Sequence, residues 1–239
     1  AQQRSVVTHS ALSLLQQWCR ERSSNGDIVL GLCAPPGSGK SHLSRQIGSG
    51  VVAVSIDDLY WPQPKLQQHQ RGLPGSHDVP RLAQLIDEFR AQGQTLVPRF
   101  DKTLAGGAGD RVDDQPHQGD QLLLEGWCIG ARGLPSLQDY QAIWRRLDAL
   151  LVLVPPTHNH VLRWRLQAEA RQRRRGGGAL HAHAVTRMVQ SFYSALPPER
   201  CFQPLLDSPQ LPTWSLRLDH RRRPIGSIQP CQIGVSSDP

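Results

Sequence analysis

The sequence predicts an α/β fold in which a mainly parallel, doubly wound sheet carries helices on both faces. Three observations support this prediction. Near-continuous apolar runs at residues 28–33, 121–125 and 149–154 are typical of central strands buried on both faces. Strand-like segments alternate with helix-compatible ones along the chain. A glycine-rich loop directly follows the first strand, at the edge of the sheet where ligands bind in such folds.

The individual elements follow from apolar spacing and chain breakers. Leu12, Leu15 and Cys19 recur at helical spacing, which predicts an amphipathic helix over residues 8–22, within an N-terminal segment 1–26. Loops rich in proline and glycine are expected at 61–80 and 99–119. The other elements are predicted, in chain order, as strand 28–33, helix 41–47, strand 51–56, helix 80–92, strand 95–97, strands 121–125 and 149–154, helices 157–174 and 182–195, and late strands 213–218 and 225–228.

Composition narrows the possible partners. The 239 residues carry a formal net charge of +7, which suits anionic partners such as nucleic acid, acidic membranes or small phosphorylated and carboxylated molecules. The five cysteines lack a C-x-x-C pair, which favours reduced thiols over a zinc site or a disulfide framework. No apolar run reaches the roughly 18 residues that a membrane span needs, and no signal-peptide-like region follows the first residues. We expect a cytoplasmic protein with no membrane partner, whose oligomeric state the sequence does not reveal.

The stretch Ala34-Pro-Pro-Gly-Ser-Gly-Lys-Ser41 has the features of a phosphate-binding loop, with Ala34 in place of the usual first glycine. It lies between a predicted strand and a predicted helix, which is the context that this motif needs. Its glycines let backbone N–H groups surround phosphate oxygens, while Lys40 reaches the β- and γ-phosphates and Ser41 contacts Mg²⁺. The sequence therefore predicts a P-loop NTPase fold over residues 1–239 that uses ATP and Mg²⁺. The predicted nucleotide-binding residues of the loop are Pro36, Gly37, Ser38, Gly39, Lys40, Ser41 and His42.

Acidic residues follow two of the predicted strands. Asp57 and Asp58 end the second strand, where a carboxylate can accept the proton of an acceptor hydroxyl or hold Mg²⁺ through water. We expect Asp57 to be the functional member and Asp58 to cap a turn or helix. Glu125 ends the strand at 121–125 and is expected to contact Mg²⁺ or its waters. The predicted metal site is thus Ser41, Asp57 and Glu125, and the predicted catalytic residues are Asp57, Lys40 and Glu125.

The last two long predicted helices are joined by an arginine-rich run and three glycines. Helices joined in this way are typical of a lid that closes over phosphates and excludes water. We therefore predict a lid with its flanking helices over about 157–196, in which Arg171, Arg174 and Arg175 contact the nucleotide. A nucleic-acid interpretation of the run is weaker, because no aromatic residue interleaves it and no nucleic-acid-binding motif is present.

Several ordered blocks together resemble one family, the D-glycerate 3-kinases of plants, fungi and bacteria. That family lies within the group containing phosphoribulokinase, uridine kinase and pantothenate kinase. The resemblance covers residues from about 28 to about 196. The blocks are Pro36-Gly-Ser-Gly-Lys-Ser41, Ser55-Ile-Asp-Asp-Leu-Tyr60, Arg71-Gly-Leu-Pro-Gly-Ser-His-Asp78, Pro98-Arg-Phe-Asp-Lys102, Gly106-Gly-Ala-Gly-Asp-Arg111, Glu125-Gly-Trp127 and Trp164-Arg-Leu-Gln-Ala-Glu169.

The resemblance implies roles for individual residues. Asp57 would correspond to the catalytic base, and Glu125 would assist the metal. Polar residues of the loops would contact the substrate, as arginine forks and loops on a rigid sheet also suggest. Only ten residues separate Tyr60 from Arg71, where many relatives are expected to have a longer insertion, so the resemblance leaves the acceptor open. The expected substrate-binding residues are Arg71, His77, Asp78, Arg99, Lys102, Asp110 and Arg111.

Taken together, these patterns predict an enzyme that transfers the γ-phosphoryl group of MgATP to a hydroxyl of a small anionic acceptor. D-glycerate, giving 3-phosphoglycerate, is the leading candidate, with Arg99 or Arg111 anchoring its carboxylate. One alternative is a nucleoside or pantothenate-type kinase on the same scaffold. Another is an ATP-binding regulatory or nucleic-acid-associated protein with little transferase activity, which would form no ADP with any small acceptor.

Overall fold

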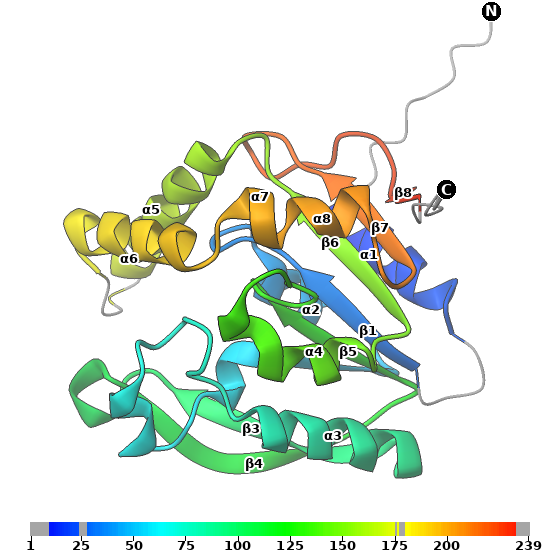
Figure 1. The fold of residues 1–239 in the computed structure, drawn as a ribbon, viewed down its shortest axis with the longest axis horizontal. Coiled ribbons are helices and arrows are strands. Elements are labelled where there is room, and N and C mark those ends of the chain that lie inside the picture. The colour runs from blue at the N-terminus through cyan, green and yellow to red at the C-terminus, as the bar shows by residue number, and fades with distance from the viewer. Residues whose placement is uncertain (1–9, 24–27, 175, 177–179, 233–239) are drawn as a thin grey trace, which may run out of the picture.

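A six-stranded sheet forms the centre of the molecule (Figure 1). The computed structural model describes residues 10–23, 28–174, 176 and 180–232. The strand order is β2-β5-β1-β6-β7-β8; the first five strands are parallel and β8 is antiparallel to β7. The sheet is therefore mainly parallel, as predicted. Its strands are β1 (Ile28–Cys33), β2 (Val51–Ser55), β5 (Gln121–Gly126), β6 (Ala149–Val154), β7 (Thr213–Arg217) and β8 (Gln229–Pro230).

Helices cover both faces of this sheet, and each face has its own apolar core. Side chains of a strand alternate between the two cores: in β1, Val29 and Cys33 face one, and Leu30 and Leu32 face the other. One core is covered by α1 (Ala11–Arg20), α2 (Lys40–Arg45) and α5 (His158–Arg174), and the other by α3 (Val79–Gln92), α4 (Gln138–Trp144), α6 (Ala182–Ala195), α7 (Pro198–Cys201) and α8 (Gln203–Asp207). This doubly wound arrangement confirms the predicted fold class.

A separate antiparallel hairpin lies beside α3 (Figure 1). It consists of β3 (Gln94–Asp101) and β4 (Asp110–Gln118). The strand predicted at 95–97 lies within β3 but is too short, and the long loop predicted at 99–119 was wrong, because most of it belongs to β3 and β4. The residues of β4 are mostly polar, include Pro116 and lack an apolar alternation, so only the pairing with β3 defines this strand.

Smaller differences concern element ends. The second strand stops at Ser55, and η1 (Ile56–Leu59) continues as a 3₁₀ helix. The strand expected at 225–228 was wrong, because β8 begins at Gln229. Three short helices, α4, α7 and α8, were not predicted, since segments of four to seven residues are too short to show a helical period. Further short 3₁₀ turns are η2 (Lys65–Gln68), η3 (Ala105–Gly107) and η4 (Pro135–Leu137).

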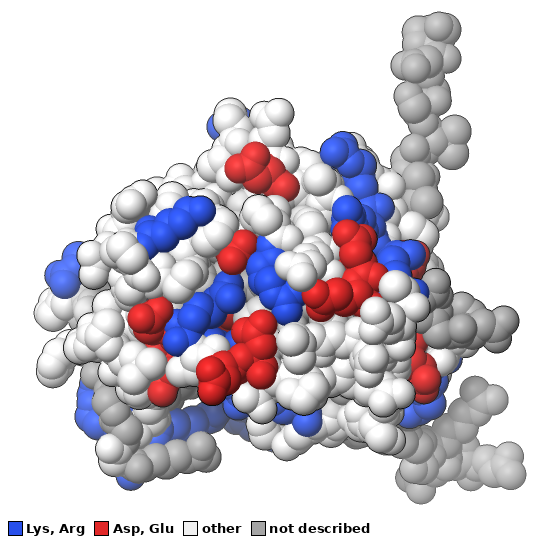
Figure 2. Space-filling view, turned by 90° about the horizontal axis from the view of Figure 1, so that it is seen from below, with Lys and Arg blue, Asp and Glu red and all other residues white. Residues whose placement is uncertain are grey.

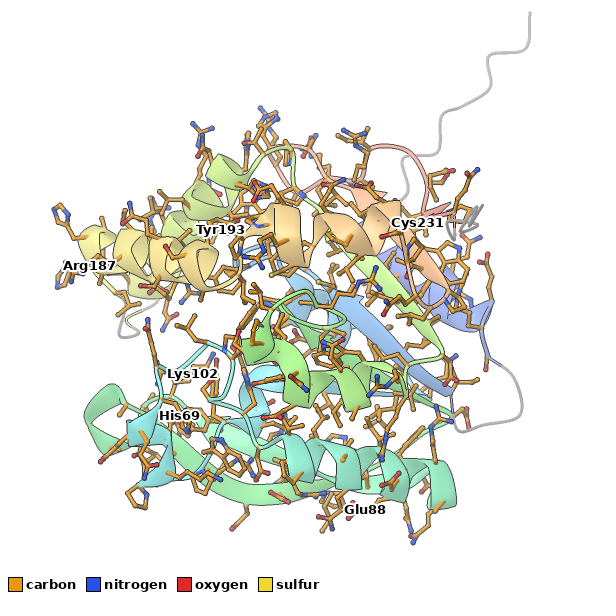
Figure 3. The ribbon with its side chains drawn as sticks, viewed as in Figure 1. His69, Glu88, Lys102, Arg187, Tyr193 and Cys231 are labelled. Carbon is orange, nitrogen blue, oxygen red and sulfur yellow. The ribbon has the colours of Figure 1, made fainter. Side chains whose placement is uncertain are left out.

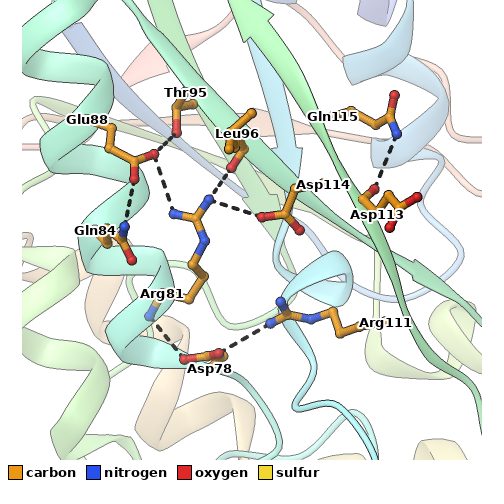
Figure 4. Close-up of polar contacts among 10 residues, drawn as sticks. All are labelled: Asp78, Arg81, Gln84, Glu88, Thr95, Leu96, Arg111, Asp113, Asp114 and Gln115. Atoms are coloured by element: carbon orange, nitrogen blue, oxygen red, sulfur yellow. Dashed lines mark hydrogen bonds and ion pairs between the residues drawn. The ribbon is translucent and has the colours of Figure 1, made fainter.

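The side chain of Arg81 fastens the hairpin to α3 (Figure 4). Its guanidinium donates to the carbonyl of Leu96 in β3, pairs with Asp114 of β4 at 3.3 Å, and pairs with Glu88 of α3 at 3.5 Å. The Thr95 hydroxyl also donates to Glu88, at 2.7 Å. Because the Arg81 side chain is only 15% exposed, this network is shielded enough to hold the hairpin in one place.

On the face formed by α3 and the hairpin, basic and acidic side chains lie side by side (Figure 2). Among the described residues, no helix is long and apolar enough to cross a membrane.

Candidate active site

The glycine-rich loop lies between β1 and α2, as the motif requires. Gly37 has a φ of +78°, and a Cβ atom there would lie 2.8 Å from the backbone nitrogen of Arg165 in α5. Gly39, with a φ of +91°, occupies the N-cap position of α2, and Lys40 begins the helix. The loop thus needs glycine at position 37 for both its backbone conformation and its close approach to α5.

The strand register brings three functional segments to one edge of the sheet. Glu125 pairs with Ser55 of β2 on one side and with Leu32 of β1 on the other. The phosphate loop begins at Ala34, just beyond β1, and Asp57 lies two residues beyond the end of β2. These are the carboxyl ends of adjacent parallel strands, so the predicted catalytic residues share this edge.

Asp57 lies among cationic and hydroxyl groups. Lys102 pairs with its carboxylate at 3.0 Å, and the Tyr60 hydroxyl donates to it at 2.8 Å. Burial alone would raise the pKa of Asp57, but the charges of Lys102 and Lys40 and the hydrogen bond from Tyr60 outweigh it and hold this pKa well below its usual range. Asp57 is therefore a carboxylate at neutral pH.

Tyr60 was not among the predicted site residues. Tyr60 follows Asp57 by three positions, and a 3₁₀ helix such as η1 places residues at that spacing on the same side. A turn predicted directly after β2 would therefore have brought Tyr60 close to Asp57.

Asp58 has different partners, at the end of β3. Its carboxylate accepts from the backbone N–H of Phe100 at 3.2 Å and pairs with Arg99 at 3.3 Å. Burial raises the pKa of Asp58, against the opposing influence of these two donors. Asp58 thus fastens the end of β3 to η1, while its neighbour Asp57 faces the lysines.

Glu125 is buried without a protein partner. It is 1% exposed, and neither carboxylate oxygen has a hydrogen-bond partner among the described residues. An unpaired buried carboxylate is costly, so this position requires a cation or ordered water from outside the protein. Within the described residues, no group of three or more His, Cys, Asp or Glu side chains could hold a metal by itself. Mg²⁺ bound by one or two protein groups, substrate phosphates and water fits this arrangement.

The hairpin and its neighbouring loops hold the residues expected to contact the substrate. Arg99 and Lys102 have side chains that are 43% and 56% exposed, so they can still meet a ligand. The side chain of Arg111 is only 16% exposed; it donates to the carbonyl of Tyr60 at 2.6 Å and pairs with Asp78 at 3.5 Å. The structure therefore separates two exposed cations from one that serves mainly to join loops.

Three other expected substrate residues also have intramolecular contacts. The Asp78 carboxylate caps α3 by accepting from the backbone N–H of Arg81, as Figure 4 shows. Asp110 accepts from the backbone N–H groups of Gln63 and Arg111. Arg71 donates to the carbonyls of residues 107 and 108, which fixes the glycine-rich turn of the hairpin.

His77 is enclosed beneath the candidate site. It is 1% exposed, stacks on Tyr60 with a centroid distance of 4.8 Å, and its Nδ1 lies 2.8 Å from the Tyr140 hydroxyl. Burial lowers the pKa of His77 to about 4, against the opposing charge of Asp57. The imidazole is therefore neutral at pH 7 and supports Tyr60, which in turn contacts Asp57.

This burial predicts a pH-dependent stability. A histidine with a pKa near 6.5 when unfolded and about 4 when folded favours the folded state above pH 6.5, and this stability is lost as the pH falls towards 4. Between about pH 7.5 and 5 the loss amounts to about 2 kcal/mol. Urea unfolding at both pH values should show that His77→Gln reduces this difference, while His69→Gln, an exposed histidine in the same loop, leaves it unchanged. An unchanged difference in His77→Gln would mean that His77 is not buried as a neutral group.

The predicted lid arginines lie at the end of α5. Arg171 and Arg174 are exposed in its last turn, and Arg175 lies outside the described residues. Helix α6 then runs from Ala182 to Ala195 and packs beside α5, so the predicted pair of helices is present.

Comparison with known proteins supports the kinase interpretation of this geometry. No protein-family model matches the chain. The uncharacterized kinase mug58 of Schizosaccharomyces pombe is 31% identical over 216 residues, which cover 69% of this chain and 77% of that protein. The chloroplastic D-glycerate 3-kinase of Arabidopsis thaliana is 26% identical over 244 residues, covering 79% of this chain and 53% of that enzyme. The chain belongs to the same family of kinases as mug58, and it is similar to D-glycerate 3-kinase.

Solved structures share the fold of this kinase. The YGR205w protein superposes with a TM-score of 0.76 and 21% identity, covering 95% of this chain and all of the other. A D-glycerate 3-kinase from Cryptococcus neoformans gives a TM-score of 0.74 and 21% identity, covering 91% of this chain and 96% of the other. The kinase spans about half the length of the chloroplastic enzyme.

Proposed function

We propose that this kinase transfers the γ-phosphoryl group of ATP to a hydroxyl of D-glycerate, giving 3-phosphoglycerate. The observation that carries the proposal is the position of Asp57, an ionised carboxylate that pairs with Lys102 of the hairpin and lies within electrostatic reach of the phosphate-loop lysine, Lys40. The two relatives named as D-glycerate 3-kinases support glycerate as the acceptor.

The phosphate loop and the acidic groups bind the donor. The loop N–H groups and Lys40 hold the β- and γ-phosphates, and Lys40 stabilises the charge that develops on the transferred group. Ser41, Asp57 and Glu125 would hold Mg²⁺, directly or through water, and Glu125 has the unpaired oxygens that such a role needs. The metal would supply charge neutralisation between the phosphates.

Asp57 orients the acceptor. In phosphoryl transfer the bond to the attacking oxygen forms late, so the catalytic base mainly positions the hydroxyl and takes its proton as the reaction proceeds. The low pKa of Asp57 keeps it in the accepting form throughout the neutral range. Tyr60, supported by His77, fixes the carboxylate for this task.

Arg99 and Lys102 are the cations best placed to bind the acceptor's carboxylate. Their side chains are exposed, whereas Arg111 is engaged with Asp78 and Tyr60. Figure 3 shows Lys102 between the hairpin and α6, the helix that carries Arg187. Arg171 and Arg174 of the lid would then neutralise the phosphates.

A coupled assay of ADP release tests the proposal directly. Reactions contain MgATP with D-glycerate, L-glycerate, pantothenate, uridine or no acceptor. We expect ADP formation with D-glycerate alone. Arg99 and Lys102 would disfavour uridine, which lacks a carboxylate, and Asp57 would accept only a hydroxyl at a fixed distance and direction from the carboxylate, which L-glycerate and pantothenate do not present. Stimulation by pantothenate or uridine would replace glycerate with another acceptor. No stimulation by any of them would contradict the glycerate assignment.

A further inference from the structure

The basic run Arg221-Arg-Arg223, beyond β7, has no part in the function described so far. It forms a compact turn: the Asp219 carboxylate accepts from the backbone N–H groups of Arg221 and Arg223, at 2.7 and 2.8 Å. The backbone carbonyl of Asp219 accepts from the N–H of Arg222, at 2.9 Å. Arg222 has a φ of +65°, a left-handed conformation that is uncommon outside glycine. The turn therefore holds Arg222 in a strained backbone conformation, which calls for an explanation.

The side chain of Arg222 joins two distant segments. Its Nε donates to the carbonyl of Gly37 in the phosphate loop at 2.7 Å, and its Nη2 donates to the carbonyl of Trp164 in α5 at 3.1 Å. The guanidinium lies 5.2 Å from the centroid of the Trp164 ring. In return, the Trp164 indole N–H donates to the carbonyl of His220 at 2.9 Å. The turn is thus attached to α5 in both directions, and the guanidinium reaches the phosphate loop from it.

The contact with Gly37 fixes the orientation of one peptide of the phosphate loop. In a trans peptide, the C=O and the following N–H point in opposite directions. Because Arg222 holds the Gly37 carbonyl on one side, the Ser38 N–H points to the other side, where it donates to the Pro35 carbonyl of the same loop at 3.3 Å. The interior of such a loop is where N–H groups meet phosphate oxygens.

The same contact connects the loop to the lid. Gly37 packs so closely on α5 that an added Cβ would lie 2.9 Å from the Trp164 carbonyl carbon. Arg222 binds the carbonyls of both residues, so it fixes the phosphate loop relative to this helix. Burial, and then the charge of Arg171 in the last turn of α5, lower the pKa of the Arg222 guanidinium. A positive group of the lid therefore lies within electrostatic reach of the turn.

We propose that Arg222 is a positioning residue of the nucleotide site, which holds the Gly37–Ser38 peptide in the orientation that binds phosphate and fixes the phosphate loop against α5. This inference rests on the proposed use of ATP, but it does not depend on the acceptor. It assigns to the C-terminal turn a role in binding the polyphosphate of the donor.

Displacement of a fluorescent ATP analogue tests the role. The competitors are MgATP and magnesium tripolyphosphate, which has the phosphates but no base. Arg222→Gly removes the side chain and suits the positive φ, whereas alanine would remain strained there. Arg222→Lys keeps the charge but cannot donate to two carbonyls in the same fork geometry. Arg221→Ala removes the same charge from an exposed neighbour and is the matched control.

We expect both Arg222 variants to bind ATP and tripolyphosphate about tenfold more weakly, as the loss of one charge-assisted contact implies, with Arg221→Ala within twofold of the parent protein. In steady-state kinetics of the Arg222 variants, KM for ATP should rise while KM for the acceptor stays unchanged. A merely structural role would not change one KM and leave the other unchanged. Thermal melting identifies variants that fail to fold, and Arg222→Lys then serves as the measured variant.

Three results would overturn the proposal. Weaker binding of ATP with unchanged binding of tripolyphosphate would show that Arg222 acts on the base rather than on the phosphate loop. Equal weakening in Arg221→Ala would show a general charge effect, and a lower melting temperature with unchanged affinities would show a structural role only. Absence of glycerate phosphorylation in the parent protein, with intact ATP and tripolyphosphate binding, would refute the acceptor assignment but leave this inference standing.

Discussion

Replacing Asp57 by asparagine is expected to lower kcat by about a thousandfold with D-glycerate and MgATP, while the protein remains folded. Asparagine keeps the shape of the side chain and can still accept from Tyr60, but it loses the charge that pairs with Lys102 and receives the hydroxyl proton. Steady-state kinetics measure the effect, and circular dichroism confirms the fold.

A carboxylate elsewhere on the hairpin provides the control for this experiment. Asp113 of β4 is exposed, and its backbone carbonyl accepts from Gln115, so Asp113→Asn removes one negative charge from the hairpin without touching the site or the Arg81 network. Its kcat should stay within about twofold of the parent value, because an exposed surface charge contributes little. Near-parental turnover in Asp57→Asn would remove Asp57 from the role of base.

Replacing Lys40 by alanine is expected to reduce kcat by about a thousandfold as well. The substitution removes the positive charge that stabilises the negative charge developing on the transferred phosphoryl group in the transition state. Lys40 begins α2 directly after Gly39, so in the proposed complex its side chain and the N-terminus of the helix would act on the same phosphates. The measurement combines ADP release with displacement of a fluorescent ATP analogue.

Arg45, an exposed residue near the end of the same helix, gives the control for Lys40. Arg45→Ala also removes a positive charge from α2, but the side chain is far along the helix from the phosphate loop, so turnover should be preserved. If Lys40→Ala kept its turnover, or if both variants lost it equally, Lys40 would not act on the transferred phosphate.

Much of the central sheet was predictable, because strands buried on both faces are apolar at almost every position. The predicted bounds of β1 and β6 match the structure, and the phosphate loop follows from its glycines and lysine. The hairpin was not predictable in the same way: β4 is polar and mostly exposed, and it is a strand because it pairs with β3 and is fastened to α3 by Arg81.

The roles of the polar loop residues were also not predictable from the sequence. Arg111 and Arg99 are alike in the sequence, as arginines in neighbouring loop blocks. In the structure, Arg111 joins Tyr60 to Asp78 and is largely covered, whereas Arg99 remains exposed. Similarly, His77 was expected to contact the substrate but is enclosed behind Tyr60. Burial and partner choice depend on residues far along the chain, so local pattern cannot assign them.

The sequence by itself determined the apolar central strands of the sheet and which residue types follow them, because apolar periodicity and glycine conformation are local properties. Only the tertiary structure decided three features of the site. They are the different partners of Asp57 and Asp58, the unpaired burial of Glu125, and the contact of Arg222 with Gly37. Each of these depends on the distance between atoms that are separated by up to 185 positions in the chain, and only the packing of the sheet and helices sets those distances.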